Sequence, residues 1–251
     1  MRALITGASS GIGREMAKLL AARGYELTLC ARREDRLREL AAELPTVCHV
    51  VAADVADEKE CRLLYEAARG DDLEVVINNA GFGLFGEFAG TDLDEELRMI
   101  DVNIRAVHIL TKLAVRDFAA RGRGYVLNVA SSAGFLPGPL MATYYASKNY
   151  VLRLTEAVRE ELRRAGSPVR VCALCPGPVD TEFNKVAGVR FSLAGLNAGR
   201  VAREALDGLF AGKAVVVPGA AMKAMTFARH FASDSLLARI TYHFQHKKNG
   251  R

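Results

Sequence analysis

The chain lacks any apolar run of the roughly 18 to 20 residues that a helix needs to cross a bilayer. This absence argues against a membrane-spanning protein. The chain also lacks an Asn-x-Ser/Thr glycosylation site, and the apolar run Ala3–Ile5 follows Met1 and Arg2 directly, so no secretory signal peptide is predicted. We therefore expect a soluble protein of the cytoplasm.

Cysteine is scarce and odd in number: Cys30, Cys48, Cys61, Cys172 and Cys175 lie scattered in apolar segments. This pattern predicts reduced, buried thiols rather than a disulfide framework. Cys172 and Cys175 form a C-x-x-C pair, which could indicate metal or redox chemistry. They lie in a strand-like run, however, and residues three apart on a strand point to opposite faces of the sheet. We interpret both as core residues and expect no metal site.

No basic stripe interleaved with aromatic residues accompanies the net charge of +5 and the pI of about 9.0. Lysine and arginine are spread along a chain that is 50% hydrophobic and 25% charged, the mixture of an ordinary globular domain. This favours an enzyme that handles phosphorylated cofactors over a nucleic-acid-binding protein. The one basic cluster, residues 247–251, is predicted to be a frayed terminus.

Strand-like and helix-like segments alternate along the chain, without a linker or a repeat. The expected strands are Arg2–Thr6, Glu26–Ala31, Val47–Ala52, Val75–Asn78, Tyr125–Val129, Val169–Cys175 and Ala214–Val217. The expected helices are Ile12–Arg23, Glu34–Glu43, Glu58–Ala68, Leu93–Ala120, Thr143–Ala165 and Val201–Phe210. Because the strands are apolar on both faces, they predict an α/β fold: a single doubly wound Rossmann-type domain, with about seven parallel strands and helices on both faces. Residues 1–219 would form the catalytic domain and residues 220–251 a helical extension of it.

A glycine-rich turn with the spacing T-G-x-x-x-G-x-G joins the first strand to the first helix. Glycines permit a tight turn and a close approach of the backbone to a pyrophosphate, and the helix N-terminus offers free N–H donors with a partial positive charge. The strand–turn–helix context raises this motif above a turn built for geometry alone. The candidate cofactor contacts are Thr6, Gly7, Ser9, Ser10, Gly11, Ile12 and Gly13.

The residues at the end of the second strand indicate whether the cofactor is NAD or NADP. A carboxylate there would bind the ribose 2′-hydroxyl, whereas a 2′-phosphate requires arginine. The strand ends in Ala31, and Arg32 and Arg33 follow. Since guanidinium groups bind phosphate through paired, charge-assisted hydrogen bonds, this favours NADP(H). The alternative is that both arginines begin a surface helix and pair with nearby acidic residues, namely Glu34, Asp35 or Glu39.

Tyr144 and Lys148 lie one helical turn apart and therefore on the same helix face. An ammonium close to a phenol favours the phenolate and would lower the pKa of the tyrosine, which makes the pair a candidate acid/base couple. Ser131 stands thirteen residues before Tyr144, just after a strand, where its hydroxyl could donate to a substrate oxygen that develops negative charge. Asn103 lies in the helical segment after Leu93.

Further polar motifs follow other strands: Asp54-Val55, Asn79-Ala80-Gly81 and the run Pro176–Thr181. With the glycine turn and Ser131, Tyr144 and Lys148, these motifs make the chain resemble the short-chain dehydrogenase/reductase family in its form of about 250 residues. The resemblance runs from Ala3 to about Thr181 with each main motif in order, and more loosely to Val217. We find no departure at the catalytic positions.

The resemblance implies a role for each of these residues. Tyr144 would be the general acid/base, Lys148 would lower its pKa and bind the nicotinamide ribose, Ser131 would orient the substrate carbonyl, and Asn103 would help hold a water in a proton relay. Asp54 and Val55 would contact adenine, and Asn79, Ala80 and Gly81 the ribose beside it. The nicotinamide-contacting loop would comprise Pro176, Gly177, Val179 and Thr181.

The implied reaction is a metal-independent hydride transfer between nicotinamide and a carbonyl or alcohol carbon, with the reductase direction favoured. By the same resemblance, a homodimer or homotetramer is expected, formed through the long helices. Two other classes stay open: an NADP-sensing regulator without turnover, and a peripheral lipid-binding protein. The first of these would not need the acid/base residues, and the second depends on the C-terminal segment alone.

An apolar small-molecule substrate is favoured by the loops expected to border the cleft. Their apolar residues are Phe82, Leu84, Phe85, Phe135, Leu136, Leu140, Met141, Phe183, Phe191 and Leu193. Beyond Pro218, two apolar helix faces are predicted on either side of a break at Ser233–Ser235, with basic residues beside them. A membrane-surface helix, a lid over the cleft, or a helix pair packed on the body or on another subunit would each show this pattern. We favour the helix pair.

Overall fold

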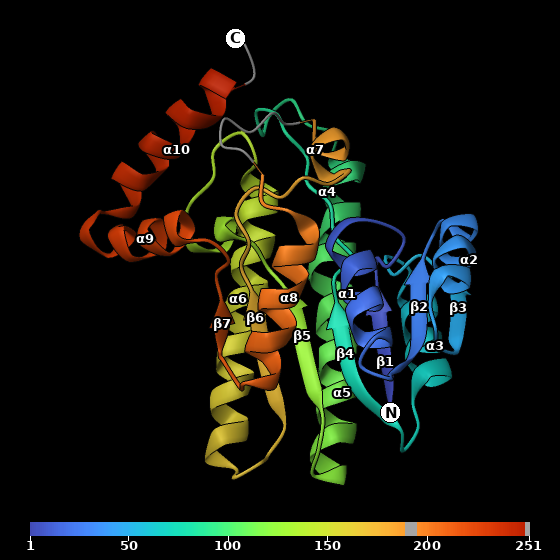
Figure 1. Cartoon of the computed structure of the whole chain (residues 1–251). Coiled ribbons are helices and arrows are strands. Elements are labelled where there is room, and N and C mark those ends of the chain that lie inside the picture. The colour runs from blue at the N-terminus through green and yellow to red at the C-terminus, as the bar shows by residue number, and fades with distance from the viewer. Residues whose placement is uncertain (189–194, 249–251) are drawn as a thin grey trace.

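The computed structural model describes residues 1–188 and 195–248. A seven-stranded parallel sheet has the order β3-β2-β1-β4-β5-β6-β7, with helices on both of its faces (Figure 1). The chain lays its strands outward from β1 in one direction as far as β3, then starts again at β4 and continues the other way to β7. This confirms the doubly wound Rossmann-type fold.

The elements follow the predicted order. The strands are β1 (Arg2–Thr6), β2 (Glu26–Ala31), β3 (Cys48–Ala52), β4 (Leu73–Asn78), β5 (Tyr125–Val129), β6 (Arg170–Leu174) and β7 (Val215–Val216). The α-helices are α1 (Gly11–Ala21), α2 (Glu34–Glu43), α3 (Glu58–Ala68), α4 (Leu93–Ile100), α5 (Val107–Arg121), α6 (Ala142–Arg164), α7 (Phe183–Val186), α8 (Ala198–Phe210), α9 (Ala220–Ala228) and α10 (Asp234–Lys248).

Apart from shifts of one or two residues at helix ends, three helical segments differ from the predicted ones. The expected helix Leu93–Ala120 is interrupted by a π-helical turn, Asp101–Ala106, between α4 and α5. A π turn continues the helix and shifts its face only slightly, so hydrophobic periodicity does not detect it. Helix α8 begins at Ala198 rather than Val201, because the Asn197 side chain caps it by accepting from the Arg200 N–H. The four-residue α7 is too short for a periodic signal.

Two apolar layers flank the sheet. One joins strand residues to α1, α2 and α8, and the other joins them to α3, α5 and α6. Cys172 lies in the first layer, whereas Cys175 packs with Val151 and Leu152 of α6 on the opposite face. The two thiols therefore point apart, as predicted, and burial raises the pKa of each to about 12. The expectation of five buried thiols is wrong for Cys48, which is half-buried in β3 at the edge of the sheet.

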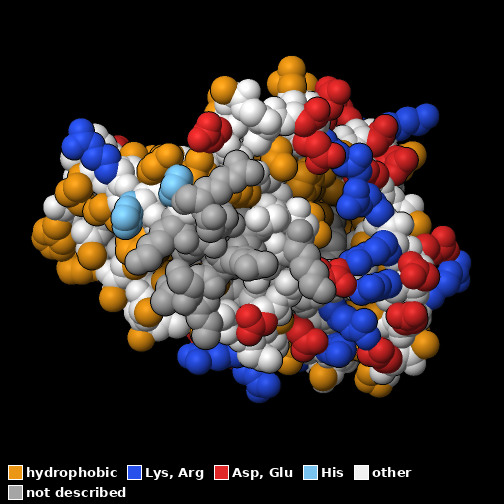
Figure 2. All heavy atoms as spheres, turned by 90° about the horizontal axis from the view of Figure 1, so that it is seen from above, with side chains coloured by type: hydrophobic (Ala, Val, Ile, Leu, Met, Phe, Trp, Pro, Cys, Tyr) orange, Lys and Arg blue, Asp and Glu red, His pale blue; other side chains and the backbone are white. Residues whose placement is uncertain are grey.

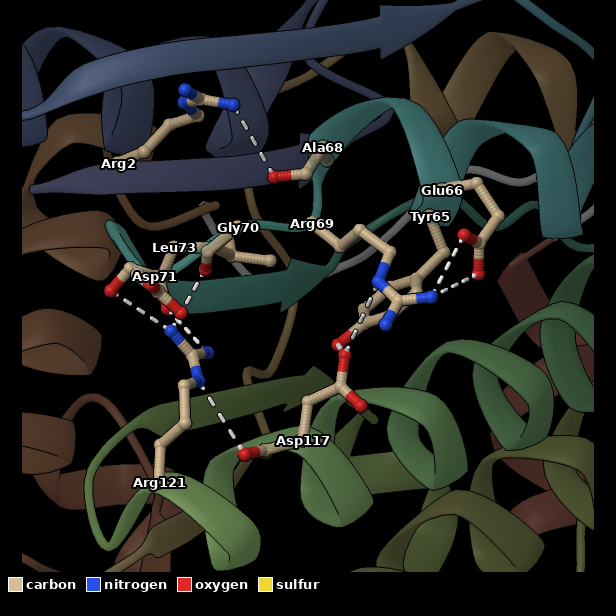
Figure 3. A network of polar contacts seen from close by, with 10 residues as sticks. All are labelled: Arg2, Tyr65, Glu66, Ala68, Arg69, Gly70, Asp71, Leu73, Asp117 and Arg121. Carbon is tan, nitrogen blue, oxygen red and sulfur yellow. Dashed lines mark hydrogen bonds and ion pairs between the residues drawn. The ribbon is translucent and has the colours of Figure 1, made fainter.

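The amino end of the sheet is closed by polar side chains that bind the backbone of the α3–β4 loop (Figure 3). The Arg121 guanidinium donates to the carbonyl oxygens of Gly70, Asp71 and Leu73 at 2.8, 3.0 and 2.8 Å. The Tyr65 hydroxyl donates to the Asp117 carboxylate at 2.9 Å. These contacts join α5, α3 and the start of β4 at the end of the sheet away from the glycine turn.

The last two α-helices lie beside the sheet rather than on either layer. In Figure 1, α9 and α10 extend sideways beyond β7, and a 3₁₀ turn, Arg229–Phe231, connects them. This arrangement has the two helices and the break that the sequence predicts. Among the helices of the described residues, none has both the length and the apolar character required to span a membrane.

Candidate active site

A cavity of about 410 Å³ opens at the carboxyl ends of the strands. Most of the predicted site residues line it, although they come from seven separate stretches of the chain. These lining residues are Gly7, Ser9, Ser10, Gly11, Ile12, Arg32, Arg33, Asp54, Val55, Asn79, Ala80, Gly81, Ser131, Tyr144, Lys148, Pro176, Gly177, Val179 and Thr181. The fold therefore brings the predicted catalytic and cofactor residues together at one site.

Three predicted residues, Thr6, Gly13 and Asn103, lie behind the described lining rather than in it. The Thr6 hydroxyl oxygen accepts from the N–H groups of Asn79 and Ala80 at 3.0 and 3.1 Å. A Cβ on Gly13 would lie 2.5 Å from the Gly7 carbonyl oxygen, so only glycine fits there. Both residues therefore hold the glycine turn against the loop after β4.

The turn itself presents donors to the cavity. Gly7 and Gly11 have φ angles of +65° and +55°, in the left-handed region that favours glycine. The Asn79 side-chain amide donates to the carbonyl oxygens of Thr6 and Gly7, both at 3.0 Å. Ser10, the N-cap of α1, makes no capping hydrogen bond with its side chain. Gly11 and Ile12, at the N-terminus of α1, line the cavity, and a helix N-terminus without a side-chain cap suits an anionic group.

Arg33 reaches across to the glycine turn. Its Nη2 lies 3.2 Å from the hydroxyl oxygens of both Ser9 and Ser10, and 2.8 Å from the Glu182 carboxylate. Arg36 binds the other oxygen of Glu182 at 2.8 Å. The partner of Arg33 is thus not one of the neighbouring acids weighed in the sequence, but a carboxylate nearly 150 positions away. Sequence reasoning missed Glu182, although it directly follows the predicted contact Thr181.

The arginine contacts also set the charge of Glu182. Hydrogen bonds and charge attraction from Arg33, with a smaller contribution from Arg36, hold the pKa of Glu182 below its ordinary value. Glu182 is therefore a carboxylate at neutral pH and neutralises part of the positive charge beside the turn. Arg32 lines the same cavity from the end of β2.

Asp54 and Val55 follow β3 and line the cavity. The Asp54 carboxylate binds Arg98 at 2.6 Å and accepts from the Ala56 N–H at 3.1 Å. These two contacts fix the loop in which Asp54 lies and join it to α4.

Tyr144 and Ser131 both line the cavity and lie next to each other. Tyr144 is 8% exposed, and its hydroxyl shares a side-chain hydrogen bond with Ser131. The Ser131 hydroxyl oxygen also accepts from the Ala133 N–H at 3.1 Å, which holds it in place. Tyr144 begins the buried face of α6, whose first turn packs on the 3₁₀ turn Ser132–Phe135 after β5.

The pKa of Tyr144 is raised above its ordinary value, because burial outweighs the lowering effect of the Ser131 hydrogen bond. This corrects the expectation that the ammonium of Lys148 dominates and lowers this pKa. Burial also lowers the pKa of Lys148 to about 8. The Lys148 Nζ donates to the Val129 carbonyl oxygen at 2.9 Å and lies 5.9 Å from the centre of the Tyr144 ring.

Asn103 lies in the π-helical turn and is fully buried. Its amide nitrogen donates to the Phe82 carbonyl oxygen at 2.9 Å and to the Ser147 hydroxyl at 3.0 Å, and its oxygen accepts from the Phe82 N–H at 3.1 Å. A Cβ on Gly81 would lie 3.0 Å from the Asn103 oxygen and 3.2 Å from Lys148 Nζ. Asn103 therefore holds the loop after β4 against α6. π turns of this kind are frequent at functional sites.

The part of the cavity where the sequence predicts the substrate has several apolar lining residues. Of the loop residues expected there, Phe82, Met141 and Phe183 line it, and sequence reasoning missed Tyr145, Asn184, Val186 and Gln245. Leu84 and Phe85 instead pack behind the wall, while Phe135 packs beneath α6. In the part of the chain that is described, Leu136 and Leu140 are also absent from the lining. Phe191 and Leu193 fall outside the described residues.

Gln245 was missed because it lies far along the chain, in α10. It is 3% exposed and donates to the Tyr145 hydroxyl oxygen at 2.9 Å. Its position means that the C-terminal extension contributes a residue to the lining of the cavity, a contact that helical periodicity could not have indicated.

Comparison with known proteins yields the same fold. A family profile described as short chain dehydrogenase matches residues 1–189. An uncharacterized oxidoreductase of Staphylococcus epidermidis is 34% identical over 185 residues, which are 73% of this chain and 80% of the relative.

Two solved structures are similar over nearly the whole chain. A short-chain dehydrogenase from Sphingobium yanoikuyae in complex with NADPH has a TM-score of 0.82 and 30% identity, and the match covers 92% of this chain and 94% of that one. A short-chain dehydrogenase/reductase from Burkholderia phymatum in complex with NAD has a TM-score of 0.84 and 26% identity, over 91% and 92%. Of these two similar structures, one therefore holds NADPH and the other holds NAD.

Proposed function

The chain belongs to the short-chain dehydrogenase family, and we propose that it uses NADP(H) to transfer a hydride to the carbonyl carbon of an apolar ketone or aldehyde. The observation that carries the proposal is the meeting of Ser131, Tyr144 and Lys148 in the cavity that the glycine turn borders. The reverse reaction, oxidation of the alcohol, uses the same residues. We favour reduction because the family resemblance implies a cofactor whose cellular pool is mainly reduced.

The proposed acid is Tyr144. The bound cofactor supplies the hydride, which makes the carbonyl carbon a carbinol carbon and leaves negative charge on the oxygen. The Tyr144 hydroxyl gives its proton to that oxygen, and the Ser131 hydroxyl donates a hydrogen bond to it. Because the Ser131 hydroxyl oxygen already accepts a hydrogen bond from the Ala133 N–H, the serine proton is left to donate to the substrate. A raised pKa keeps Tyr144 protonated and ready to act as an acid.

Lys148 acts beside the acid rather than on the substrate. Its buried ammonium would stabilise the tyrosinate that forms when Tyr144 loses its proton. With a pKa near 8, Lys148 is mostly protonated at neutral pH, and it can return a proton more easily than an ordinary lysine. Asn103 holds the loop at Phe82 and Gly81 and so fixes the space next to Lys148.

Arg33 supports the choice of NADP(H). Its guanidinium lies beside the hydroxyl groups of Ser9 and Ser10, where a 2′-phosphate next to the glycine turn would be bound. Arg32 lies at the same end of β2 and would add charge. The cavity offers Ala31 rather than an acidic side chain at the end of that strand, and a carboxylate there is what a free ribose 2′-hydroxyl would favour.

We include residues 220–251 in the same catalytic unit as residues 1–219, since Gln245 lines the cavity. The proposal also takes in the cytoplasmic location and the homodimer or homotetramer that the sequence implies. Phe82, Met141 and Phe183 support an apolar substrate.

The proposal is tested by following NADPH absorbance while the purified protein is offered a panel of bulky ketones and aldehydes. Oxidation of NADPH, with NADH at least about tenfold less effective, is expected from the arginine contacts. Binding of NADPH with no turnover on any carbonyl compound would instead support a cofactor-sensing regulator.

A further inference from the structure

The excess positive charge of the chain is confined to its last segment. Residues 220–251 hold six of the 34 lysines and arginines but only one of the 29 acidic residues. Residues 1–219 therefore carry 28 charges of each sign and are formally neutral, so the whole net charge of +5 belongs to the C-terminal segment. Charged residues of both signs are spread along the chain, as the sequence indicates, but the excess of positive over negative charge lies in residues 220–251 alone.

Helix α10 differs from a helix that packs on a core in which side chains it buries: polar residues face the body and large apolar residues face outward. Thr241 and Gln245, one turn apart, are 8% and 3% exposed and face the body. Leu236, Ile240 and Phe244 form an i, i+4, i+8 stripe that is 47%, 43% and 56% exposed. The most buried side chains of the described part of this helix are thus polar, with Leu237 half-buried beside them, and its larger apolar stripe faces outward. A packed surface helix shows the opposite pattern.

The preceding turn continues this outward apolar face. Helix α9 buries none of its residues, and Phe227 and Phe231 are 67% and 79% exposed, with ring centres 5.5 Å apart. Figure 2, which looks onto the carboxyl edge of the sheet, shows hydrophobic side chains gathered on the lobe formed by α9 and α10.

The segment is nonetheless fixed to the body. The Arg229 guanidinium lies 4.9 Å from the centre of the Phe135 ring, and a Cβ on Gly177 would lie 2.6 Å from Met222. The exposed apolar face therefore belongs to a segment that packs against the body of the protein, and not to a frayed terminus.

We propose that the face formed by α9, the turn 229–231 and α10 docks on the surface of an anionic lipid bilayer. Aromatic and aliphatic side chains beside lysine and arginine are what an interfacial helix needs, because the apolar groups enter the headgroup region while the cations bind acidic lipids. Lys223 and Arg239 are exposed beside the apolar stripe, and Lys247 and Lys248 follow in the sequence of the same helix.

Charge decides between a bilayer and a second copy of the chain. Two copies joined through this face would bring together two segments that each carry the full net charge of +5, and like charges oppose such contact. An anionic bilayer is complementary to the same segment.

Docking would also place the active site near the bilayer. Gln245 belongs to α10 and lines the cavity, so the docked helix borders the substrate end of the site. An apolar substrate dissolved in lipid would then reach the cavity from the docked side. This last step rests on the proposed function, whereas the docking itself does not.

The test is flotation of the full-length protein with vesicles of phosphatidylcholine, with and without phosphatidylglycerol. Because each basic side chain near an anionic surface contributes a factor of roughly five, we expect at least about tenfold tighter binding to the anionic vesicles, reduced at high ionic strength. Lys223→Gln combined with Arg239→Gln should weaken binding about tenfold or more. Phe231→Ser combined with Phe244→Ser should also release the protein.

Matched variants in the body provide the controls. Arg62→Gln combined with Arg164→Gln removes two exposed charges, and Phe88→Ser removes a phenylalanine that is 68% exposed, so neither should alter flotation. Thermal unfolding and NADPH titration of every variant establish that it is folded.

Absence of flotation, equal binding to neutral vesicles, or equal losses in the body variants would overturn the proposal. The proposal would also be overturned if the variants of this face changed from dimer to monomer, measured by light scattering, while their vesicle binding stayed unaltered. A second copy of the chain would then cover this face. Vesicle binding in a protein that oxidises no NADPH would leave the docking intact and refute the proposed function alone.

Discussion

The two ends of the sheet use similar polar side chains in opposite ways. At the amino end, Arg121 donates to three backbone carbonyl groups and Tyr65 donates to the Asp117 carboxylate (Figure 3). Both side chains therefore form hydrogen bonds within the protein. At the carboxyl end, the tyrosine is Tyr144 and the arginine is Arg33, and both line a cavity.

Burial has a different consequence at each end. Burial and the Asp117 hydrogen bond both raise the pKa of Tyr65, so its proton is locked in a structural contact. Burial raises the pKa of Tyr144 too, but there the Ser131 hydrogen bond opposes it. The two buried tyrosines thus differ in the partner of the hydroxyl group: a carboxylate for Tyr65 and, for Tyr144, a serine in the lining of the cavity.

The largest expected effect lies at the open end. Tyr144→Phe removes the proposed proton donor and should lower kcat by about a thousandfold, within the range that general acid catalysis contributes. NADPH affinity, measured by fluorescence titration, should stay within about twofold because the phenyl ring remains in place. The matched variant Tyr65→Phe, at the closed end, should retain kcat. Comparable activity in both variants would remove the distinction between the two ends.

Lys148→Met should abolish turnover and at the same time stabilise the fold. The folded-state pKa of about 8 lies below the ordinary 10.5, so the folded protein is penalised for keeping this ammonium. The penalty, about 3 kcal/mol at most from the size of the shift, is complete below the folded pKa. It declines as the pH rises from about 8 to 10.5, because the folded protein then releases the buried proton while the unfolded chain still holds it, and it vanishes above 10.5, where Lys148 is neutral in both states.

Urea unfolding of wild type and Lys148→Met across this pH range checks the sign. The variant should gain most at neutral pH and least at alkaline pH. A constant difference, or a loss of stability at neutral pH, would contradict the account of Lys148 as a buried cation.

Arg33→Ala should weaken NADPH binding by about ten- to a hundredfold, the value of hydrogen bonds to a charged group, and leave NADH binding nearly unchanged. Isothermal titration with both cofactors measures the two losses. Arg38→Ala is the control, because Arg38 lies on the same helix and pairs with Glu34 on the helix surface. Equal losses for NADPH and NADH would refute the assignment of Arg33 to the 2′-phosphate.

Arg121→Ala sharpens the comparison from the closed end. Three carbonyl groups lose a charged donor, so the free energy of unfolding should fall by about 1–3 kcal/mol. The value of kcat/KM should change by about twofold at most, because the two ends are separated by the length of the sheet. Denaturant unfolding and steady-state kinetics together decide; a kinetic defect without loss of stability would be contrary to this picture.

The smallest expected effect is a gain. Glu182 holds Arg33 and Arg36 where a phosphate would be bound, so Glu182→Gln should tighten NADPH binding by about two- to fivefold, the range for a half-exposed ion pair. NADH binding should not change, and Glu34→Gln is the matched control. If NADPH binding is unaltered or weakened, Glu182 does not compete with the cofactor.

The sequence predicts most of the site, because the family's motifs follow strands and the carboxyl ends of parallel strands meet at one edge. Ser131 is foreseen for this reason, and Tyr144 and Lys148 are foreseen from their spacing of one helical turn and from the family resemblance. Glu182 and Gln245 are not, since each acts through a contact between segments far apart in the chain. The raised pKa of Tyr144 is also missed: the i, i+4 spacing indicates the ammonium nearby, but burial depends on the whole fold.

The fold is predicted in order and topology, with errors where periodicity carries little information. The π turn that contains Asn103 is one such place, because one additional residue in a helical turn leaves the apolar pattern readable as a single helix. The reversed polarity of α10 is another. Its apolar positions predict a helix correctly but indicate the wrong face toward the body, since Thr241 and Gln245 are the buried residues.

The most direct test of the central claim follows the hydrogen itself. NADPH carrying deuterium at the transferable position of its nicotinamide ring is incubated with the protein and a reducible ketone, and the alcohol is analysed by mass spectrometry. The account predicts one deuterium on the former carbonyl carbon for wild type and almost no product for Tyr144→Phe. An alcohol without deuterium at that carbon, or product formed equally well by Tyr144→Phe, would contradict it.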